Sequence, residues 1–454
     1  MDIKKFIYIF MIMLGMSCFC LGCGDGAEEA MAYAEDGTEQ ESSAEIIVEE
    51  DLLSEKEPES ISENDGLPEK VTGGEDGIGA EEEASENAVR PEPVKVKGIY
   101  VSGPVAGMAK MDELIGLVDQ TELNAMVIDV KNDEGKVTYK MHSDQVQELG
   151  TSVGYISDIK GLVNKCKGKD IYLIARIVAF RDPYLAEKKP EWAVHDRKGE
   201  VFHDKNGMAW VNPYNREVWD YLVEVASQAA MDGFDEVQFD YIRFSTDIKE
   251  EELDYGTEAQ KIDKIEIITE FTKYLYDNLV PCGVYVAADV FGTVIDNETD
   301  QKIVGQDYVR MAQNLDYICP MVYPSHYRNG AYGIAVPDAD PYATIHAAAV
   351  SSARQLQAVP EEECAHVRLW LQSFTASWVP NHISYGPRQI REQIKAAYDA
   401  GYEEWILWNA TVRYQSDSLL TPEEAEAERQ RWEAGKPEPE KSVSENSMHM
   451  STVQ

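Results

Sequence analysis

The sequence predicts a (β/α)8 TIM barrel preceded by a disordered acidic spacer. Between Val94 and Gln415, eight short apolar runs alternate with helical patterns. Several of these runs end in a charged or aromatic side chain, and the segment before them is strongly acidic and almost free of aromatic residues. Eight alternating β and α units favour a closed barrel over an open sheet.

The acidic charge is concentrated before the predicted barrel. The chain has 454 residues and a formal net charge of −42, which argues against binding nucleic acid through its phosphates. Roughly half of the excess negative charge lies between Gly24 and Pro93. Such a segment cannot bury enough apolar surface to offset the entropy lost on ordering. We therefore predict that residues 23–93 form a disordered linker.

The N-terminus has the features of an export signal. Lys4 and Lys5 precede an apolar run of about 15 residues, which is typical of a signal peptide and short for a membrane span. The following "CLGC" resembles the bacterial lipobox, although Cys20 stands where that motif prefers Leu. We predict a lipoprotein-type signal peptide over residues 1–22 and lipid attachment at Cys23. A plain secretory signal and an uncleaved anchor are the alternatives. The expected location is the outer side of the cell membrane.

The predicted strands have a regular spacing. Helical patterns lie between them, for example at 110–122, 216–232 and 387–401. No glycine-rich fingerprint follows the first strand, which disfavours a dinucleotide fold, and we predict no cofactor. Residues 416–454 begin as a helical pattern and become a polar tail. The eight strands are expected at 96–102, 124–131, 170–177, 235–241, 282–290, 315–323, 366–374 and 403–409.

Polar and aromatic side chains stand at the C-terminal ends of these strands. In a (β/α)8 barrel the functional site lies at this end, where the loops converge. Carboxylates and amides accept hydrogen bonds from sugar hydroxyls, and aromatic rings stack on sugar rings. The pattern therefore indicates a carbohydrate site. The residues concerned are Asp129, Arg176, Asp240, Asp289, Tyr323, His326, Gln372 and Trp408.

Several extended motifs resemble one bacterial family. They are "GIYVSG", "IARIVAFRDPYLAEKKPEWAV", "WVNPYNREVWDY", "GFDEVQFDYIRF", "ADVFG" and "ICPMVYPSHY", in this order. Together they resemble the bacterial putative glycoside hydrolase family of (β/α)8-barrel domains. The resemblance covers Val94 to Gln415. It implies a barrel related to glycosidases and leaves the substrate open.

Two carboxyl groups are needed to cleave a glycosidic bond, one as acid and one as nucleophile or base. Asp240 and Asp289 end neighbouring strands and are our candidates. Arg243 would keep Asp240 ionised, as a nucleophile requires. Apolar residues follow Asp289, which suits a raised pKa and an acid role. The alternative is structural: Asp240 would pair with Arg243 or cap the next loop, and Asp289 would cap the turn before Gly292.

The remaining candidates have two interpretations each. Asp129 would orient substrate or pair with Lys131, and Arg176 would hold a catalytic carboxylate or form a structural salt bridge. A lone loop histidine such as His326 is often a surface residue, and single aromatic residues often pack in the core. The predicted substrate-binding residues are Asp129, Arg176, Arg243, Tyr323, His326, Gln372 and Trp408, with Trp378 as a further member of a sugar platform.

The insert between the third and fourth strands, residues 180–215, is long enough to have a function such as covering the cleft. Its Asp196, His203 and Asp204 suggest a metal, but "HDRKGEVFHDKNG" fits a hairpin with two glycine turns better, and we predict no metal site. Cys166, Cys282, Cys319 and Cys364 show no metal-binding spacing and are expected as free thiols, with one disulfide as the alternative.

Together these observations predict a monomeric, exported glycosidase that acts on a polysaccharide or oligosaccharide. The alternative is a non-catalytic glycan-binding barrel on the cell surface. A purely structural envelope lipoprotein is a third possibility, and it would have no polar and aromatic pocket at the strand ends.

Overall fold

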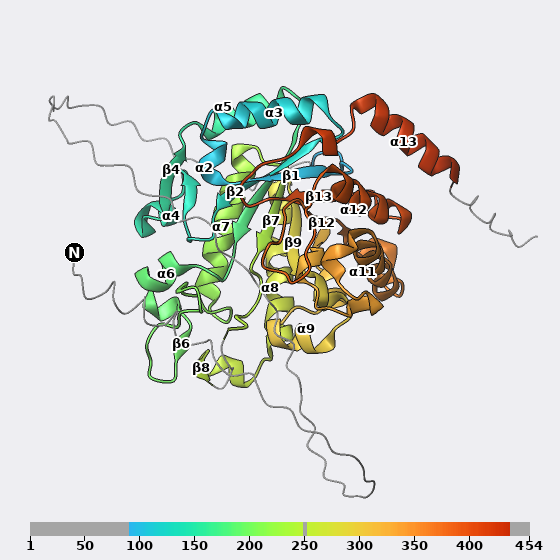
Figure 1. Cartoon of the computed structure of the whole chain (residues 1–454). Helices are drawn as coiled ribbons and strands as arrows, with labels where there is room; N and C mark the ends of the chain where they lie inside the picture. Colours follow the sequence, from blue (N-terminus) through green and yellow to red (C-terminus); the bar gives the residue numbers. More distant parts are fainter. Residues whose placement is uncertain (1–89, 248–251, 436–454) are drawn as a thin grey trace, which may run out of the picture. The chain divides into compact units, whose positions relative to one another are not determined.

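The computed structural model describes residues 90–247 and 252–435 (Figure 1). It contains a closed barrel of eight parallel strands, which confirms the predicted fold class. Each strand pairs with the next, and the last pairs with the first. The predicted signal peptide, Cys23 and nearly all of the acidic linker lie outside the described residues. In order around the barrel, the strands are β1 (Lys97–Val101), β2 (Ala125–Lys131), β5 (Tyr172–Val178), β7 (Glu236–Asp240), β9 (Tyr285–Phe291), β10 (Tyr317–Met321), β12 (Leu369–Gln372) and β13 (Trp405–Trp408).

The strands form where the sequence has continuous apolar runs. Every residue of β2 and of β5 is buried, as expected for parallel strands that are covered on both faces. All eight predicted strands are present, with ends shifted by a few residues. The seventh run is divided into β11 (His366–Val367) and β12 by Arg368. The buried guanidinium of Arg368 pairs with Glu236 at 2.7 Å and with Glu404 at 2.9 Å.

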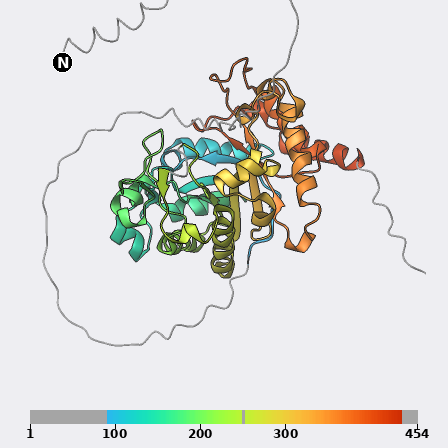
Figure 2. The same ribbon diagram turned by 90° about the horizontal axis from the view of Figure 1, so that it is seen from below.

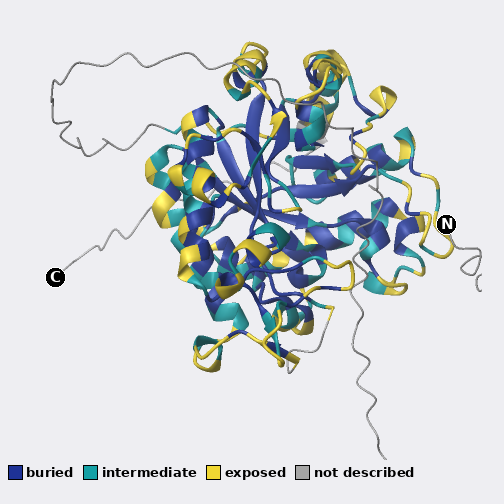
Figure 3. Ribbon diagram, turned by 90° about the vertical axis from the view of Figure 1, so that its left-hand side faces the viewer, coloured by how far each residue is buried: buried dark blue, intermediate teal, exposed yellow. Residues whose placement is uncertain are grey.

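Helices cover the outside of the barrel, and the buried strands lie in its middle (Figures 2 and 3). The longest helix, α7, begins after Asn215, whose side chain accepts a hydrogen bond from the backbone N–H of Glu217, and ends at Gly233 with φ of 105°. The helices are α2 (Gly103–Ala106), α3 (Lys110–Gln120), α4 (Asp144–Leu149), α5 (Ile159–Lys167), α6 (Pro183–Lys188), α7 (Arg216–Asp232), α8 (Lys264–Leu279), α9 (Glu298–Val304), α10 (Tyr308–Ala312), α11 (Pro341–Leu356), α12 (Pro387–Asp399) and α13 (Pro422–Gly435).

Two pairs of short strands accompany the barrel in the described residues. β3 (Val137–Tyr139) and β4 (Ser152–Ile156) continue the sheet beyond β2, and β6 (His195–Asp196) pairs with β8 (Leu253–Asp254).

The predicted hairpin turns are confirmed in the insert. The Asp196 carboxylate accepts backbone hydrogen bonds from Lys198 and Glu200, and Asp204 accepts them from Asn206 and Met208. Glycines in the left-handed region close both turns, with φ of 83° at residue 199 and 76° at residue 207. The carboxylates of Asp196 and Asp204 therefore stabilise the two turns of the hairpin.

The chain enters the barrel at the end opposite to the C-terminal strand ends. Arg90 forms an ion pair of 2.8 Å with Asp316, which precedes β10, and its guanidinium lies 4.9 Å from the ring centre of Tyr285 at the start of β9. The Tyr285 hydroxyl donates a hydrogen bond to the Pro91 carbonyl. Contacts with the barrel thus begin a few residues before Val94, within the predicted linker.

The cysteines among the described residues are free thiols, with Cys166 and Cys319 buried and Cys282 and Cys364 half-buried. Within residues 90–247 and 252–435, no helix combines the length and apolar character needed to cross a membrane.

Candidate active site

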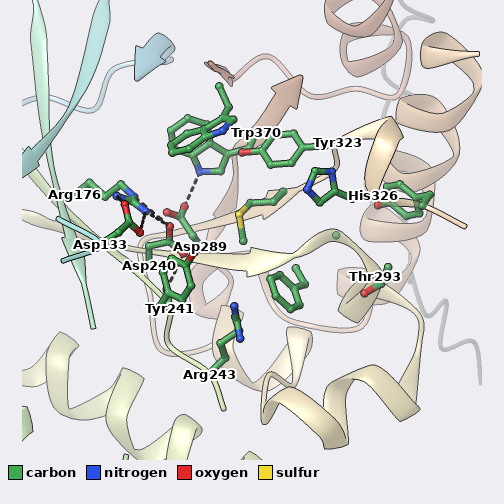
Figure 4. Close-up of a pocket in the computed structure, with 15 residues that line it drawn as sticks. Asp133, Arg176, Asp240, Tyr241, Arg243, Asp289, Thr293, Tyr323, His326 and Trp370 are labelled. Atoms are coloured by element: carbon green, nitrogen blue, oxygen red, sulfur yellow. Dashed lines mark hydrogen bonds and ion pairs between the residues drawn. The ribbon is translucent and has the colours of Figure 1, made fainter. Parts of the chain in front are cut away.

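A pocket of about 900 Å³, counting its open mouth, lies at the C-terminal ends of the strands. Its lining comes from six barrel strands and the loops that follow β2, β7, β9 and β10, so residues distant in sequence meet there (Figure 4). The lining residues are Asp133, Arg176, Asp240, Tyr241, Arg243, Asp289, Phe291, Gly292, Thr293, Met321, Tyr323, His326, Tyr327, Trp370 and Trp408.

Strand register brings the two predicted catalytic residues together. Phe239 of β7 pairs with Ala288 of β9, so the next residues, Asp240 and Asp289, stand at the same level of the barrel. Both are almost completely buried, with 7% and 2% of their surfaces exposed. Their carboxyl groups lie beside each other in the pocket (Figure 4).

Asp240 is surrounded by hydrogen-bond donors. One carboxylate oxygen accepts hydrogen bonds from Nε and Nη2 of Arg176, at 3.1 and 2.6 Å, and the other accepts one of 2.7 Å from the backbone N–H of Tyr241. Tyr241 has φ of 55°, an uncommon backbone conformation for a residue with a large side chain. Burial raises the pKa of Asp240 above its usual value, and the Arg176 charge opposes this rise.

Asp289 has a different environment. One of its oxygens accepts a hydrogen bond of 2.6 Å from the indole N–H of Trp370. Burial, followed by the nearby charge of Asp240, raises the pKa of Asp289 well above its usual value. The neutral, protonated form is therefore favoured at Asp289, whereas Asp240 has a bidentate cationic partner.

Arg176 also holds two other carboxylates. Its Nη1 donates a hydrogen bond of 2.8 Å to Asp129, and its Nη2 lies 3.3 Å from Asp133. Asp129 in turn accepts a hydrogen bond of 2.6 Å from the Tyr100 hydroxyl. Burial raises the pKa of Asp129 to about 6 although Arg176 opposes this. At Asp133 desolvation also raises the pKa, but the charge and hydrogen bonds of Arg176 together with the Arg181 charge outweigh it, so the pKa is lowered.

Asp133 reaches the pocket from a tight turn after β2. Asn132 closes this turn by accepting hydrogen bonds from the backbone N–H groups of Glu134 and Lys136. Gly135 has φ of 75°, and a Cβ atom there would lie 1.9 Å from a carboxylate oxygen of Asp182. The Asp182 carboxylate is itself fixed by a fully buried ion pair of 2.7 Å with Lys131. The turn therefore rests on a rigid support, and it presents a carboxylate with 34% of its side chain exposed.

Aromatic rings form another part of the pocket wall. Trp408 packs against Tyr100, with ring centres 4.2 Å apart, and against Trp370 at 5.6 Å. Tyr323 and His326 lie on the side away from Arg176 (Figure 4). Desolvation lowers the pKa of His326 to about 4, so this ring is neutral near pH 7.

Two of the predicted substrate-binding residues, Asp129 and Gln372, do not line the pocket, and Trp378 of the predicted sugar platform does not line it either. Asp129 lies behind Arg176 with 2% of its surface exposed, and its partner is Arg176, not Lys131. Gln372 is fully buried. Its side chain accepts a hydrogen bond from the Ser325 backbone and donates to Asp338 and to the Phe374 carbonyl. We correct both predictions: these side chains connect parts of the protein to each other.

The other predicted residues, Arg176, Arg243, Tyr323, His326 and Trp408, line the pocket. Of the structural alternatives for the two aspartates, one is seen in part, because Asp240 accepts a hydrogen bond from the backbone N–H of Tyr241 in the next loop. Its ion pair is with Arg176, and Asp289 binds the Trp370 indole. Arg243 instead packs its guanidinium near the rings of Phe291, at 4.5 Å, and Tyr241, at 4.9 Å.

The insert at 180–215 supplies none of the lining residues among those described. It supports the pocket from outside. Arg181 donates a hydrogen bond of 3.2 Å to the Tyr241 hydroxyl, and the Trp210 ring meets the Tyr241 ring edge-on at 6.0 Å. Arg243 also lies over Trp210 at 5.0 Å.

The sequence reasoning did not select Asp133, Tyr327 or Trp370. The sequence could have indicated Trp370, because it lies two residues before Gln372 and thus faces the same side of the strand. No sequence pattern indicates Asp133, because its place in the pocket depends on the geometry of the turn. Among the described residues, no group of three or more His, Cys, Asp or Glu side chains is arranged to hold a metal ion.

A family described as "Putative glycosyl hydrolase domain" matches residues 98–414. Among solved structures, the PgaB (BpsB) glycoside hydrolase domain from Bordetella bronchiseptica is 13% identical, with a TM-score of 0.50 over 75% of this chain and 98% of that chain. The α-galactosidase TtGalA from Thermus thermophilus is 13% identical, with a TM-score of 0.44 over 76% and 63%. A hypothetical protein from Ruminiclostridium thermocellum ATCC 27405 is 36% identical, with a TM-score of 0.39 over 42% and 97%. No curated protein matches the sequence.

Proposed function

The chain belongs to this family of glycosyl hydrolase domains, and we propose that it cleaves glycosidic bonds of an oligosaccharide or polysaccharide outside the cytoplasm. The observation that carries the proposal is the contrast between Asp240 and Asp289. They lie side by side in the pocket, one held by a bidentate arginine and the other next to an indole N–H with its pKa raised well above the usual value.

We assign the nucleophile to Asp240. Its carboxylate has about four acceptor positions, of which Arg176 and the Tyr241 backbone occupy three, and 7% of the residue remains exposed to the pocket. Its remaining lone pair attacks the anomeric carbon while the bond from that carbon to the leaving oxygen breaks. Arg176 keeps Asp240 ionised and oriented, the role that the sequence analysis gave to Arg243.

Asp289 supplies the proton to the leaving oxygen. Its raised pKa favours the protonated form that a general acid needs. In the second step Asp289 accepts a proton from water, and the water oxygen attacks the anomeric carbon and releases Asp240. Trp408 and Tyr323 offer ring faces to the sugar, and Asp133 and Arg243 offer polar contacts to its hydroxyls.

The proposed location rests on the N-terminal sequence alone. Arg90 and Pro91 meet the barrel at the end opposite to the pocket. A lipid on Cys23 would attach the protein through the residues that precede Arg90. We propose that the protein acts as a monomer, because one chain supplies both carboxyl groups of the pocket.

A screen of polysaccharides and labelled oligosaccharides with the full-length protein tests the proposal. We expect release of reducing ends from at least one substrate, and loss of that release in Asp240→Asn with the fold intact. A parent protein that binds a glycan and releases no product, with unchanged binding in Asp240→Asn, would overturn the hydrolase assignment in favour of the glycan-binding barrel.

A further inference from the structure

Trp378 is an exposed tryptophan close to the pocket. It lies in the loop that follows β12, and 39% of its surface is exposed. Other described tryptophans, such as Trp219, Trp370 and Trp405, are buried. Its ring stacks on Phe374, with ring centres 5.9 Å apart and an interplanar angle of 20°. One face of the indole is thus covered by protein.

Phe374 connects this indole to the pocket wall. Its ring centre lies 6.0 Å from that of Tyr323 and 6.4 Å from that of His326, and both of these residues line the pocket. We call the rings of Tyr323, His326, Phe374 and Trp378 the aromatic ladder, because contacts between them connect the pocket lining to the exposed indole. Tyr323 and His326 lie on the side of the pocket away from Arg176 (Figure 4).

The loop holds Trp378 in place. Ala376 is fully buried, and its carbonyl accepts a hydrogen bond from the Val379 N–H across the tryptophan. The hydroxyl of Thr375 accepts a hydrogen bond of 3.0 Å from the Tyr385 N–H, which joins the two ends of the loop. The backbone N–H of Ser373 donates a hydrogen bond to the Trp408 carbonyl of the neighbouring strand. An aromatic side chain fixed before binding loses little entropy when a ligand stacks on it.

We propose that Trp378 forms an outer sugar-binding subsite, so that the substrate is an oligosaccharide or polysaccharide of several units and not a short glycoside. This inference rests on the proposed function, because it extends the same pocket. The catalytic carboxyl groups act on one sugar unit and the bond to its neighbour, and the aromatic ladder provides a stacking surface for a unit further along the chain. The subsite contributes binding without touching the reacting atoms.

The test compares long and short ligands of the same sugar. The probes are α-1,4- and β-1,4-linked disaccharides and hexasaccharides of glucose, N-acetylglucosamine, galactose and galactosamine. Binding is measured by calorimetry on the full-length Asp240→Asn protein, with and without Trp378→Ala. We expect the hexasaccharide that binds most tightly to lose roughly tenfold in affinity on Trp378→Ala, with the matching disaccharide unchanged. Trp378→Phe should retain part of the affinity.

Met231→Ala is the matched control, because Met231 is an exposed apolar residue on α7 outside the ladder, with 71% of its surface exposed. It should change neither affinity. Equal losses for both ligand lengths, no loss at all, or no hexasaccharide bound more tightly than its disaccharide would each overturn the subsite. If Trp378→Ala causes the length-dependent loss of affinity and the parent protein cleaves none of the probes, the subsite would be supported and the proposed hydrolase overturned. Cleavage without a length-dependent loss would overturn the subsite alone.

Discussion

Arg176 donates two hydrogen bonds to a single carboxylate oxygen of Asp240, 3.1 Å from Nε and 2.6 Å from Nη2. The same guanidinium binds Asp129 through Nη1 and approaches Asp133. A planar guanidinium with five donors can hold several acceptors in fixed directions, which an ammonium group cannot do. Arg176 is therefore a positioning residue for the candidate nucleophile, and it also links that residue to the more exposed carboxylate of Asp133.

The first prediction concerns the two hydrogen bonds from Arg176 to Asp240. Arg176→Lys keeps the charge and loses the bidentate geometry, so kcat/KM should fall by roughly a hundredfold while the protein stays folded. The acidic limb of the pH–rate profile should move to higher pH, because fewer hydrogen bonds stabilise ionised Asp240. Arg216→Lys, at a partly exposed ion pair with Glu270 on the surface, should change neither. A profile that does not move in Arg176→Lys would remove Arg176 from this role.

The second prediction concerns the turn that carries Asp133. Gly135→Ala places a residue with a Cβ atom at φ of 75° and against the Asp182 carboxylate, 1.9 Å away. Gly199→Ala has the same backbone cost at φ of 83° with nothing within 4 Å. We expect urea unfolding to show a loss of roughly 1–2 kcal/mol for Gly199→Ala, and about 1–3 kcal/mol more for Gly135→Ala. Equal losses would mean that Asp182 moves freely and that the turn has no rigid support.

The site residues differ in how far the sequence could predict them. The positions of Asp240 and Asp289 were predictable because Asp240 ends β7 and Asp289 lies two residues before the end of β9, both strands with a strong apolar pattern. Parallel register then brings the two positions together. Gln372 also ends a strand, but its side chain has partners at Ser325, Asp338 and Phe374. Two of these partners come from other loops, and no local pattern shows that they approach.

Electrostatic partners were harder to predict than positions. Arg243 is three residues from Asp240 in sequence, whereas Arg176 is on the neighbouring strand, and the structure gives the bidentate contact to Arg176. Likewise Lys131 is two residues from Asp129 and pairs with Asp182 instead. The register of β2 is irregular between Asp129 and Lys131, and Arg243 lies in the loop after β7. Spacing along the chain therefore does not show which side chains meet in the barrel interior.

The third prediction uses the raised pKa of Asp289. A carboxyl group whose pKa is higher in the folded than in the unfolded protein binds its proton more tightly when folded. Its contribution to stability is therefore complete below the unfolded value and is lost as the pH rises through the folded value. Asp289→Asn keeps the acceptor for Trp370 and does not titrate. Thermal melts between about pH 4 and pH 8 should show its melting temperature rising relative to the parent as pH increases.

Asp112→Asn is the control for these melts, since this carboxylate on α3 is exposed, with 65% of its side chain accessible. Its difference from the parent should vary little with pH. An Asp289→Asn curve parallel to that of the parent would show that Asp289 is ionised in the folded protein throughout this range, and would exclude it as the acid.

The fourth prediction tests the proposed lipid anchor. Cys23→Ser removes the thiol to which acyl chains would attach, so the protein should move from the membrane fraction to the soluble fraction of lysed cells. Cys20→Ser changes the neighbouring cysteine of the same segment and should leave the protein in the membrane fraction. Membrane association that persists in Cys23→Ser would favour an uncleaved N-terminal anchor.

The last prediction separates the roles of the two aspartates. Asp240→Asn removes the attacking group, so every substrate should lose turnover by several powers of ten. Asp289→Asn removes the proton donor, so substrates with a good leaving group, such as nitrophenyl glycosides of the sugar that the parent cleaves, should keep much of their first-step rate. In the parent, activity should fall as pH rises through the pKa of Asp289, because the acid must be protonated.

Added azide should partly restore turnover in Asp240→Ala, because the shortened side chain leaves space in which this small anion can attack the anomeric carbon from the side of the missing carboxylate. The product would be a glycosyl azide of inverted configuration, visible by NMR. Near-normal turnover in both asparagine variants would refute the assignment of either residue to the chemistry. A strong dependence on the leaving group in Asp240→Asn alone would exchange the two roles. In that case the bidentate contact with Arg176 would hold the acid, and the Trp370 indole would orient the nucleophile.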